Sequence, residues 1–126
     1  MSSVFKYSSK HAGLIKLRSK LEGRIAKILD FLCDRKIYLS WSYEKQVVKY
    51  TNGKGQRKNY IVDFKVIGQD KRAFFIEGKG EMKDVDKRKI EAAKSLGMDI
   101  YLMQDRDVSD WEKSLFSEYR FRKAST

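Results

Sequence analysis

Two runs of β-branched and aromatic residues, 59–67 and 73–80, constrain the fold of this chain more than any other feature. Each run has the length and composition of a strand, and the polar segment 68–71 separates them. Two such runs joined by a short polar segment predict a β-hairpin. The chain is therefore expected to contain at least one antiparallel strand pair near its middle.

The predicted hairpin brings charged residues together. Side chains on a strand alternate between its faces, so Glu77 and Lys79 are expected on one face, roughly 6 to 7 Å apart along the strand. If the turn is centred on Asp70, Asp63 lies directly opposite Glu77 in the antiparallel pair. Two carboxylates and one ammonium group would then share one face of the hairpin.

Like charges at this separation repel each other unless positive charge lies between them. A divalent cation such as Mg²⁺ would supply that charge, because it is commonly held by one or two carboxylates together with phosphate oxygens. Lys79 could then orient or deprotonate an attacking water, or stabilise charge on a scissile phosphate. The same short pattern also fits solvated or ion-paired residues at a sheet edge, because such motifs occur often by chance.

The composition favours a nucleic-acid partner. The 126 residues are enough for one domain, and 28 Lys and Arg against 17 Asp and Glu give a formal net charge of +11. No apolar run approaches the roughly 20 residues of a membrane-spanning helix, and no signal or lipidation motif is evident. The single Cys33 and single His11 argue against an intrachain disulfide and a His/Cys zinc site, and a cytoplasmic location is expected.

The N-terminal half divides into an arm and a helix. Residues 1–13 are polar and basic and are expected to form a flexible arm, whereas residues 14–126 are expected to form a single domain. Apolar residues recur at three- and four-residue steps over 14–33, which predicts an amphipathic helix. Glu22 lies at the rim of its apolar stripe, where it would either face a cleft or pair with Arg18 at the surface.

Basic residues gather in three places. They lie on the predicted helix 14–33, in a loop over 51–59 that follows one or two strands predicted over 37–50, and at the start of a later helix. They would contact a DNA backbone, or else remain solvated. The candidates for DNA binding are Lys16, Arg18, Lys20, Lys54, Arg57, Lys58, Lys87, Arg88 and Lys89.

The C-terminal part predicts two helices with a strand between them. The first helix is capped by Asp84 or Asp86 and stops before Gly97. The strand 99–103 follows, and a strand, helix and strand in succession place it parallel to the strand of the hairpin that carries the glutamate. A capping box that starts at Ser109 predicts a final short helix.

Taken in order, several segments resemble the PD-(D/E)xK nuclease superfamily, and within it the phage endonuclease I type of Holliday-junction resolvase. No single motif is specific, but their joint order and spacing cover nearly the whole chain. They are residues 17–22, 59–64, 75–80, 86–89 and 99–102. The resemblance implies an α/β protein with a mixed sheet and a restriction-endonuclease-like core, in the order helix, β-hairpin, helix, strand, helix.

The resemblance also implies roles for individual residues. Asp63 and Glu77 would bind Mg²⁺, for which Mn²⁺ would substitute, Lys79 would be the catalytic lysine, and Glu22 would supply a further carboxylate beside the metal. It further implies a homodimer, in the family domain-swapped, in which helix and hairpin residues of different chains meet. The sequence departs from the family pattern at Val62, which stands where the motif has proline.

The function implied is that of a magnesium-dependent endodeoxyribonuclease that hydrolyses phosphodiesters with a metal-activated water and selects branched DNA such as a Holliday junction. A phage origin would place it in the host cell cytoplasm. One alternative is a mismatch, nicking or site-specific endonuclease of the same superfamily, although no helix stands out as a reader of base edges. The other is a non-catalytic nucleic-acid-binding protein, since a fold alone does not determine function.

Overall fold

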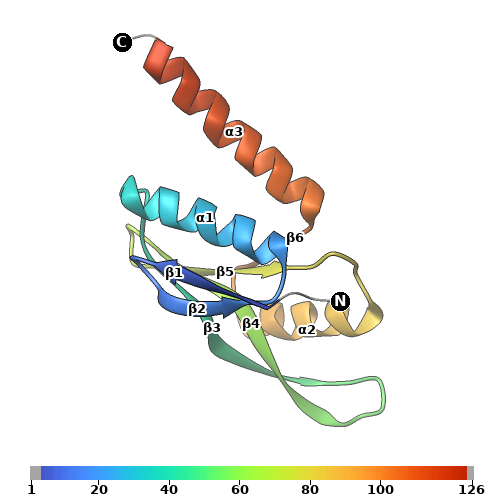
Figure 1. Ribbon diagram of the computed structural model, residues 1–126. Coiled ribbons are helices and arrows are strands. Elements are labelled where there is room, and N and C mark those ends of the chain that lie inside the picture. Colours follow the sequence, from blue (N-terminus) through green and yellow to red (C-terminus); the bar gives the residue numbers. More distant parts are fainter. Residues whose placement is uncertain (1–3, 125–126) are drawn as a thin grey trace.

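The computed structural model describes residues 4–124, with side chains described through Leu115. Within this range six strands and three helices follow one another (Figure 1). In chain order they are β1 (Phe5–Ser9), β2 (Gly13–Leu17), α1 (Lys20–Asp34), β3 (Tyr38–Thr51), β4 (Arg57–Gly68), β5 (Ala73–Gly78), α2 (Asp84–Ser95), β6 (Ile100–Met103) and α3 (Asp105–Ala124).

A four-stranded mixed sheet forms the centre of the molecule, in the order β3, β4, β5, β6. The β3–β4 and β4–β5 pairs are antiparallel, and the β5–β6 pair is parallel. The predicted hairpin is the β4–β5 pair, and the predicted parallel strand is β6. The chain is thus a mixed α/β protein as expected, with β1 and β2 forming a separate two-stranded sheet.

The sheet has a hydrophobic core on each face. Ile25 and Leu29 of α1 cluster with Ile76 of β5 in one core, and Ile90 of α2 clusters with Phe75 of β5 in the other. Successive residues of a strand point to opposite faces, so α1 and α2 cover opposite sides of β5. Figure 1 shows the two helices above and below the sheet.

The β4–β5 pair has the predicted register. Ile67 lies opposite Ala73, and the paired residues continue to Phe64 opposite Ile76. The turn between the strands is therefore centred on Asp70, which is the condition on which the expected pairing of Asp63 with Glu77 depended. This register determines which residues meet at the far end of the pair.

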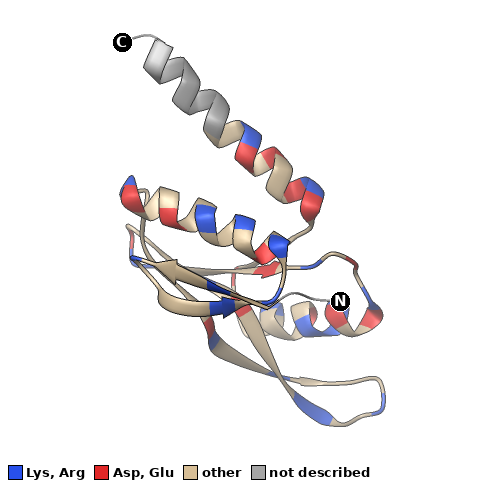
Figure 2. Ribbon diagram, in the orientation of Figure 1, with Lys and Arg blue, Asp and Glu red and all other residues tan. Residues whose placement is uncertain are grey.

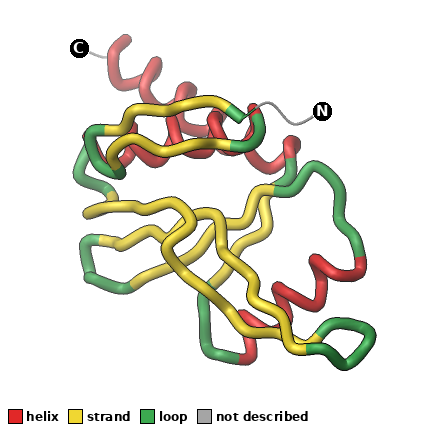
Figure 3. Tube along the Cα trace, turned by 60° about the horizontal axis from the view of Figure 1, so that its bottom comes forward, coloured by secondary structure: helices red, strands yellow, loops and turns green. Residues whose placement is uncertain are grey.

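The N-terminal segment is not a flexible arm where the structure describes it, which corrects the prediction for residues 1–13. Phe5 lies opposite Leu17 and Ser9 opposite Gly13 in an antiparallel β1–β2 pair (Figure 3). The polar, small residues of this segment had indicated disorder, but they form a ribbon that contacts α1. Its order therefore comes from contacts distant in the sequence.

The first helix is shorter than the predicted span 14–33. It begins at Lys20, because Ser19 caps it by accepting the N–H of Glu22 at 3.1 Å. Leu17, which fitted the helical periodicity, is instead a strand residue with 0% exposure in the core beneath α1. The apolar period continued across the boundary because both elements bury residues against the same core.

Asp30 of α1 joins three elements. Its carboxylate accepts the hydroxyls of Tyr7 and Ser9 at 2.6 Å each, and the indole N–H of Trp41 at 2.9 Å. Tyr7 and Ser9 belong to β1, whereas Trp41 belongs to β3. The carboxylate therefore connects the β1–β2 ribbon and the main sheet to α1.

Replacing Asp30 by Ala should lower the free energy of unfolding by about 3 kcal/mol, because three donors lose a charged acceptor. Urea unfolding of the metal-free protein would measure the change. Asp110→Ala, at an exposed position of α3, serves as the control and should change stability by less than about 0.5 kcal/mol. Equal stability of the two variants would show that the Asp30 network contributes nothing.

The second helix agrees closely with its prediction. It covers Asp84–Ser95, and Gly97 follows it with a left-handed φ of 81°. Lys83 is the residue before the first turn, and its N–H donates to Asp86 Oδ2 at 3.0 Å. Asp86 is therefore the capping carboxylate, acting from inside the helix.

The last helix begins at Asp105, which corrects the predicted start at Ser109. Asp107 Oδ2 accepts the N–H of Gln104 at 2.8 Å and so caps the earlier turn. The residues of the expected capping box serve another purpose, since Arg24 of α1 donates to the Ser109 hydroxyl and to the Glu112 carboxylate. These contacts fasten the start of α3 to α1.

Candidate functional site

Asp63 and Glu77 lie directly beyond Phe64 and Ile76, the last two residues at which β4 pairs with β5. Each carboxylate binds the backbone of the opposite strand. The Asp63 N–H donates to Glu77 Oε1 at 2.9 Å, and the Gly78 N–H donates to Asp63 Oδ2 at 3.0 Å. The predicted juxtaposition of the two carboxylates is present, and their backbone contacts hold it in place.

The β4 strand twists at this point. Val62 and Phe64 pack into different hydrophobic cores, although residues two apart share a face on a regular strand. The neighbouring β3 strand is bulged after Tyr43, where its register shifts and Glu44 takes a left-handed φ of 53°. Bulges increase local twist, so Asp63 lies where the two cores meet.

Glu22 faces this region from the first turn of α1. It is buried, with 6% exposure, and its Oε1 accepts the N–H of Arg18 at 2.6 Å and the hydroxyl of Tyr43 at 3.0 Å. The Arg18 guanidinium pairs with Glu44 at 3.0 Å rather than with Glu22. Of the two expectations for Glu22, the structure favours the inward-facing carboxylate over the surface ion pair.

The electrostatics of the site show a deficit of positive charge. Burial raises the pKa of Asp63 to about 9, and the negative charges of Glu77 and Glu22 add to the effect. Burial also raises the pKa of Glu77, against the backbone hydrogen bond from Asp63. No salt bridge reaches either of these two carboxylates from a side chain that the structure describes. The site would therefore favour a proton or a cation between its carboxylates.

Lys79 directly follows the end of β5, and its positive charge acts to lower the pKa of Glu77. Its N–H donates to Met103 C=O at 3.0 Å and extends the pairing of β5 with β6. Its ammonium lies 3.4 Å from Asp86 Oδ1, and Asp86 is itself buried. Burial acts to raise the pKa of Asp86, but the Lys83 N–H and the Lys79 ammonium together lower it.

The donor set fits a hard divalent cation. Among the residues described, no three His, Cys, Asp or Glu side chains form a complete cluster of metal ligands. Asp63 and Glu77 nevertheless provide two carboxylates, and Mg²⁺ often takes only one or two from a protein while water and phosphate complete its shell. The raised pKa values of the half-buried Asp63 and the buried Glu77 are what two neighbouring carboxylates with little water around them show when no counter-ion lies between them.

The predicted DNA-binding loop is the tip of the β3–β4 hairpin, which extends beyond the rest of the sheet (Figures 1 and 2). Lys54 lies in the turn itself. A hollow of about 500 Å³ on the hairpin is lined by Lys49, Arg57, Lys58 and Asn59. Lys49 was not among the candidates, because it lies within the strand rather than in the loop.

The cations of α2 lie against this hairpin. The Arg88 guanidinium lies close to Gly53 at the tip, since its Nη2 would be 3.8 Å from a Cβ atom at that position. The Lys89 ammonium lies over the rings of Tyr50 and Tyr60, at 5.9 and 5.5 Å from their centroids. Two of the predicted groups of basic residues therefore form one region, the hairpin surface, which comprises Lys49, Lys54, Arg57, Lys58, Arg88 and Lys89.

The remaining candidates lie elsewhere. Lys87 is exposed on α2, next to the hairpin surface in sequence. Lys16, Arg18 and Lys20 lie on β2, before α1 and at its start, and all three are exposed. Arg18 is engaged with Glu44, so it is the least available of them for a phosphate.

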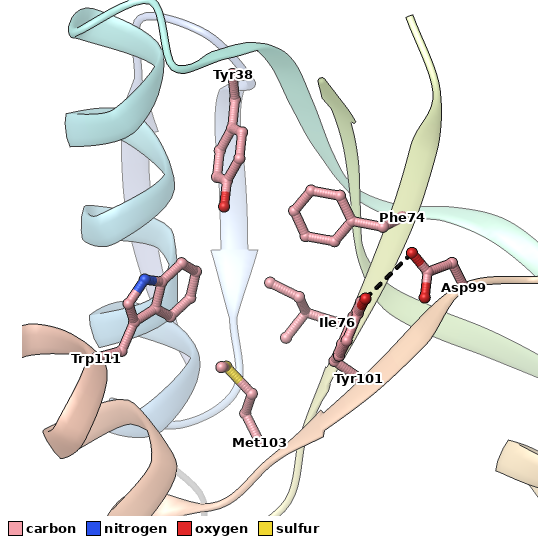
Figure 4. A pocket seen from close by; sticks show the side chains of 7 residues that line it. All are labelled: Tyr38, Phe74, Ile76, Asp99, Tyr101, Met103 and Trp111. Atoms are coloured by element: carbon pink, nitrogen blue, oxygen red, sulfur yellow. Dashed lines mark hydrogen bonds between the residues drawn. The ribbon is translucent and has the colours of Figure 1, made fainter. Parts of the chain in front are cut away.

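A second hollow lies on the face of β5 that carries Phe74 and Ile76, opposite to the face that carries Glu77. It has a volume of about 310 Å³, and Phe74 and Ile76 of β5 line it with Trp111 of α3 (Figure 4). Its single charged lining residue, Asp99, accepts the hydroxyl of Tyr101 at 3.2 Å. It lacks the paired carboxylates and cations of the Asp63 region, so the latter is the better candidate for chemistry.

Three residues of the site were missed by the sequence analysis. Tyr43 and Tyr60 matched the apolar pattern of their strands, which indicated only burial. Asp86 was considered only as a helix cap. Its position seven residues beyond Lys79, at the start of the next helix, was the available signal for an ion pair.

Comparison with protein-family models, with curated proteins and with solved structures gives no significant match. No helix in the described part of the chain is both long and apolar enough to cross a membrane. The functional interpretation therefore rests on the residues and their geometry.

Proposed function

We propose that this protein is a magnesium-dependent endodeoxyribonuclease that cleaves phosphodiester bonds in branched DNA. The observation that carries the proposal is the pair of a half-buried Asp63 and a buried Glu77, both with raised pKa values and without a salt bridge to a described side chain. Glu22 and Lys79 lie beside them. A cation and a phosphate would neutralise the charges that the fold leaves unbalanced.

The architecture supports a restriction-endonuclease-like core. One helix, α1, precedes three antiparallel strands, and α2 then leads to a strand parallel to the third of them. This is the order that the resemblance to PD-(D/E)xK nucleases implies. On such a core the three acidic residues and the lysine would take the roles that the resemblance implies.

The roles of the residues follow from their positions. Asp63 and Glu77 would hold the metal, with Glu22 supplying a further carboxylate on the α1 side. A bound Mg²⁺ would polarise the scissile phosphate and lower the pKa of a water molecule. Lys79 would orient the attacking water and stabilise charge on the phosphate, while Asp86 holds its ammonium beside the site.

The basic surface supports DNA as the substrate. Arg57 lies six residues from Asp63 along β4, which corresponds to roughly 20 Å in a strand. The hairpin surface would thus contact backbone phosphates well away from the bond that is cut. The resemblance adds three further parts to the proposal. The protein would select branched DNA, act as a homodimer and be located in a host cell cytoplasm.

The test is incubation of the purified protein with a labelled four-way junction and with a linear duplex of equal length, in Mg²⁺ and in EDTA. Paired nicks near the crossover, only with metal, are expected. Equal cleavage of both substrates would favour a mismatch, nicking or site-specific endonuclease. Binding without cleavage in either Mg²⁺ or Mn²⁺ would indicate a non-catalytic nucleic-acid-binding protein.

Glu22→Gln should reduce junction cleavage by about 100-fold, a typical cost of losing a group that supports a metal site. Glutamine keeps an oxygen acceptor for the Arg18 N–H and the Tyr43 hydroxyl, so the fold should persist. Single-turnover cleavage measures the effect, with the exposed Glu91→Gln as the control. A rate equal to that of the control would reduce Glu22 to a helix-capping residue.

A further inference from the structure

Tyr60 places a buried hydroxyl next to the proposed metal site. Its side chain is 4% exposed and packs in the core formed with Val62, Phe75 and Ile90. The hydroxyl oxygen is fully buried, yet it makes no hydrogen bond of normal geometry within the part of the chain that the structure describes. A buried hydroxyl without a partner costs free energy that phenylalanine would avoid.

The carboxylates of the site act electrostatically on this hydroxyl. Burial raises the pKa of Tyr60, followed by the negative charge of Glu77 and a close contact with its carboxylate that falls short of normal hydrogen-bond geometry, and then by the charges of Asp63 and Asp86. The other buried tyrosine of the site differs, because the Tyr43 hydroxyl donates to Glu22 at 3.0 Å. Of these two tyrosines, Tyr60, next to Asp63 and Glu77, is therefore the one whose hydroxyl lacks a hydrogen bond of normal geometry.

The Tyr60 ring is held while the Glu77 carboxylate has freedom to turn. The ring packs in the α2 core and lies 5.5 Å from the Lys89 ammonium on its face. The Asp63 N–H donates to Oε1 of Glu77, and the Tyr60 hydroxyl lies near the same carboxylate without a hydrogen bond of normal geometry. The last torsion of a glutamate side chain is broad, so a rotation of the carboxylate about it is the movement that would improve this contact.

We propose that Tyr60 is a positioning residue for the metal site, whose hydroxyl donates a hydrogen bond to Glu77 Oε2 when a divalent cation is bound. The inference rests on the proposed function, since it assigns Glu77 as a metal ligand. Hydrogen bonds to ligating carboxylates fix their orientation and raise metal affinity. The unpaired hydroxyl in the metal-free protein is then the partner that cation binding satisfies.

The test compares Tyr60→Phe with Tyr50→Phe. Both rings lie beneath the Lys89 ammonium, so the control repeats the ring packing and removes a hydroxyl that is not fully buried. Mn²⁺ binding to DNA-free protein is measured by calorimetry, and thermal unfolding is measured in EDTA. Tyr60→Phe should bind Mn²⁺ about 10- to 100-fold more weakly than wild type. Its melting temperature in EDTA should equal or exceed that of wild type.

The outcomes separate the two proposals. Wild-type Mn²⁺ affinity in Tyr60→Phe would overturn the role of Tyr60 alone. A lower melting temperature of Tyr60→Phe in EDTA would also overturn it, because the hydroxyl would then be paired without metal. Failure of the wild-type protein to bind Mn²⁺ would overturn the metal site itself, and the role of Tyr60 with it. Tyr50→Phe should match wild type in both measurements.

Discussion

Glu77→Gln and Asp63→Asn should each reduce cleavage of a four-way junction by about 100- to 1000-fold, while the affinity for the junction changes little. Each change removes one of two carboxylates that would hold the metal, and loss of a group that stabilises developing charge costs a factor of about 10² to 10³. Binding should persist because the hairpin surface lies roughly 20 Å along β4 from the site. Glutamine and asparagine also keep the acceptors for the backbone N–H groups.

Single-turnover cleavage in Mg²⁺ and a gel-shift titration in EDTA measure the two quantities separately. Glu91→Gln, on the exposed face of α2, controls for loss of negative charge as such. Lys58→Ala should show the opposite behaviour, with weaker binding and a smaller salt dependence. Cleavage at the wild-type rate by both carboxylate variants would exclude the assigned site, whatever their binding.

Asp63→Asn should make the metal-free protein more stable at neutral and alkaline pH, although it removes activity. The pKa of Asp63 is raised from 3.8 to about 9 on folding, so between these values the folded state holds a proton that the unfolded state releases. Stability of the wild type should therefore fall as the pH rises from about 5 to 8, by at most about 1.4 kcal/mol per pH unit. Asparagine cannot titrate, and its curve should be flatter.

Urea unfolding in EDTA at several pH values between 5 and 8 would test this. At pH 8, Mn²⁺ should restore stability to the wild type and have little effect on Asp63→Asn, since the cation replaces the missing positive charge. Parallel pH curves for the two proteins would contradict the electrostatic account of the site. A gain in stability from Mn²⁺ that is equal in both would point to a different cation site.

The parts of the site that could be predicted are those governed by local rules. Asp63, Glu77 and Lys79 followed from the alternation of strand side chains and from a turn centred on Asp70, both of which involve about twenty consecutive residues. The parallel β6 strand followed from the order of strand, helix and strand. These features depend little on the rest of the chain.

The parts that were missed depend on contacts distant in the sequence. The β1–β2 ribbon is ordered through Asp30, whose partners Tyr7 and Trp41 are 23 and 11 residues away. The start of α3 depends on its own cap at Asp107 and on Arg24, far back in α1. A periodic pattern carries no information on such partners, so flexibility and a later helix start were predicted instead.

The two carboxylates stand on supports of unequal stiffness. β4 pairs with β5 only from Phe64 to Ile67, so from Asp63 outward it pairs with β3 alone. Two-stranded ribbons twist more readily than wider sheets. Beyond Asp63 the hairpin is therefore expected to twist more easily than the rest of the sheet, whereas Glu77 pairs with Leu102 of β6. A polymer bound at the tip would then act on Asp63 through the ribbon, and the hydrogen bonds between each carboxylate and the opposite backbone would resist a change in the spacing of the two acids.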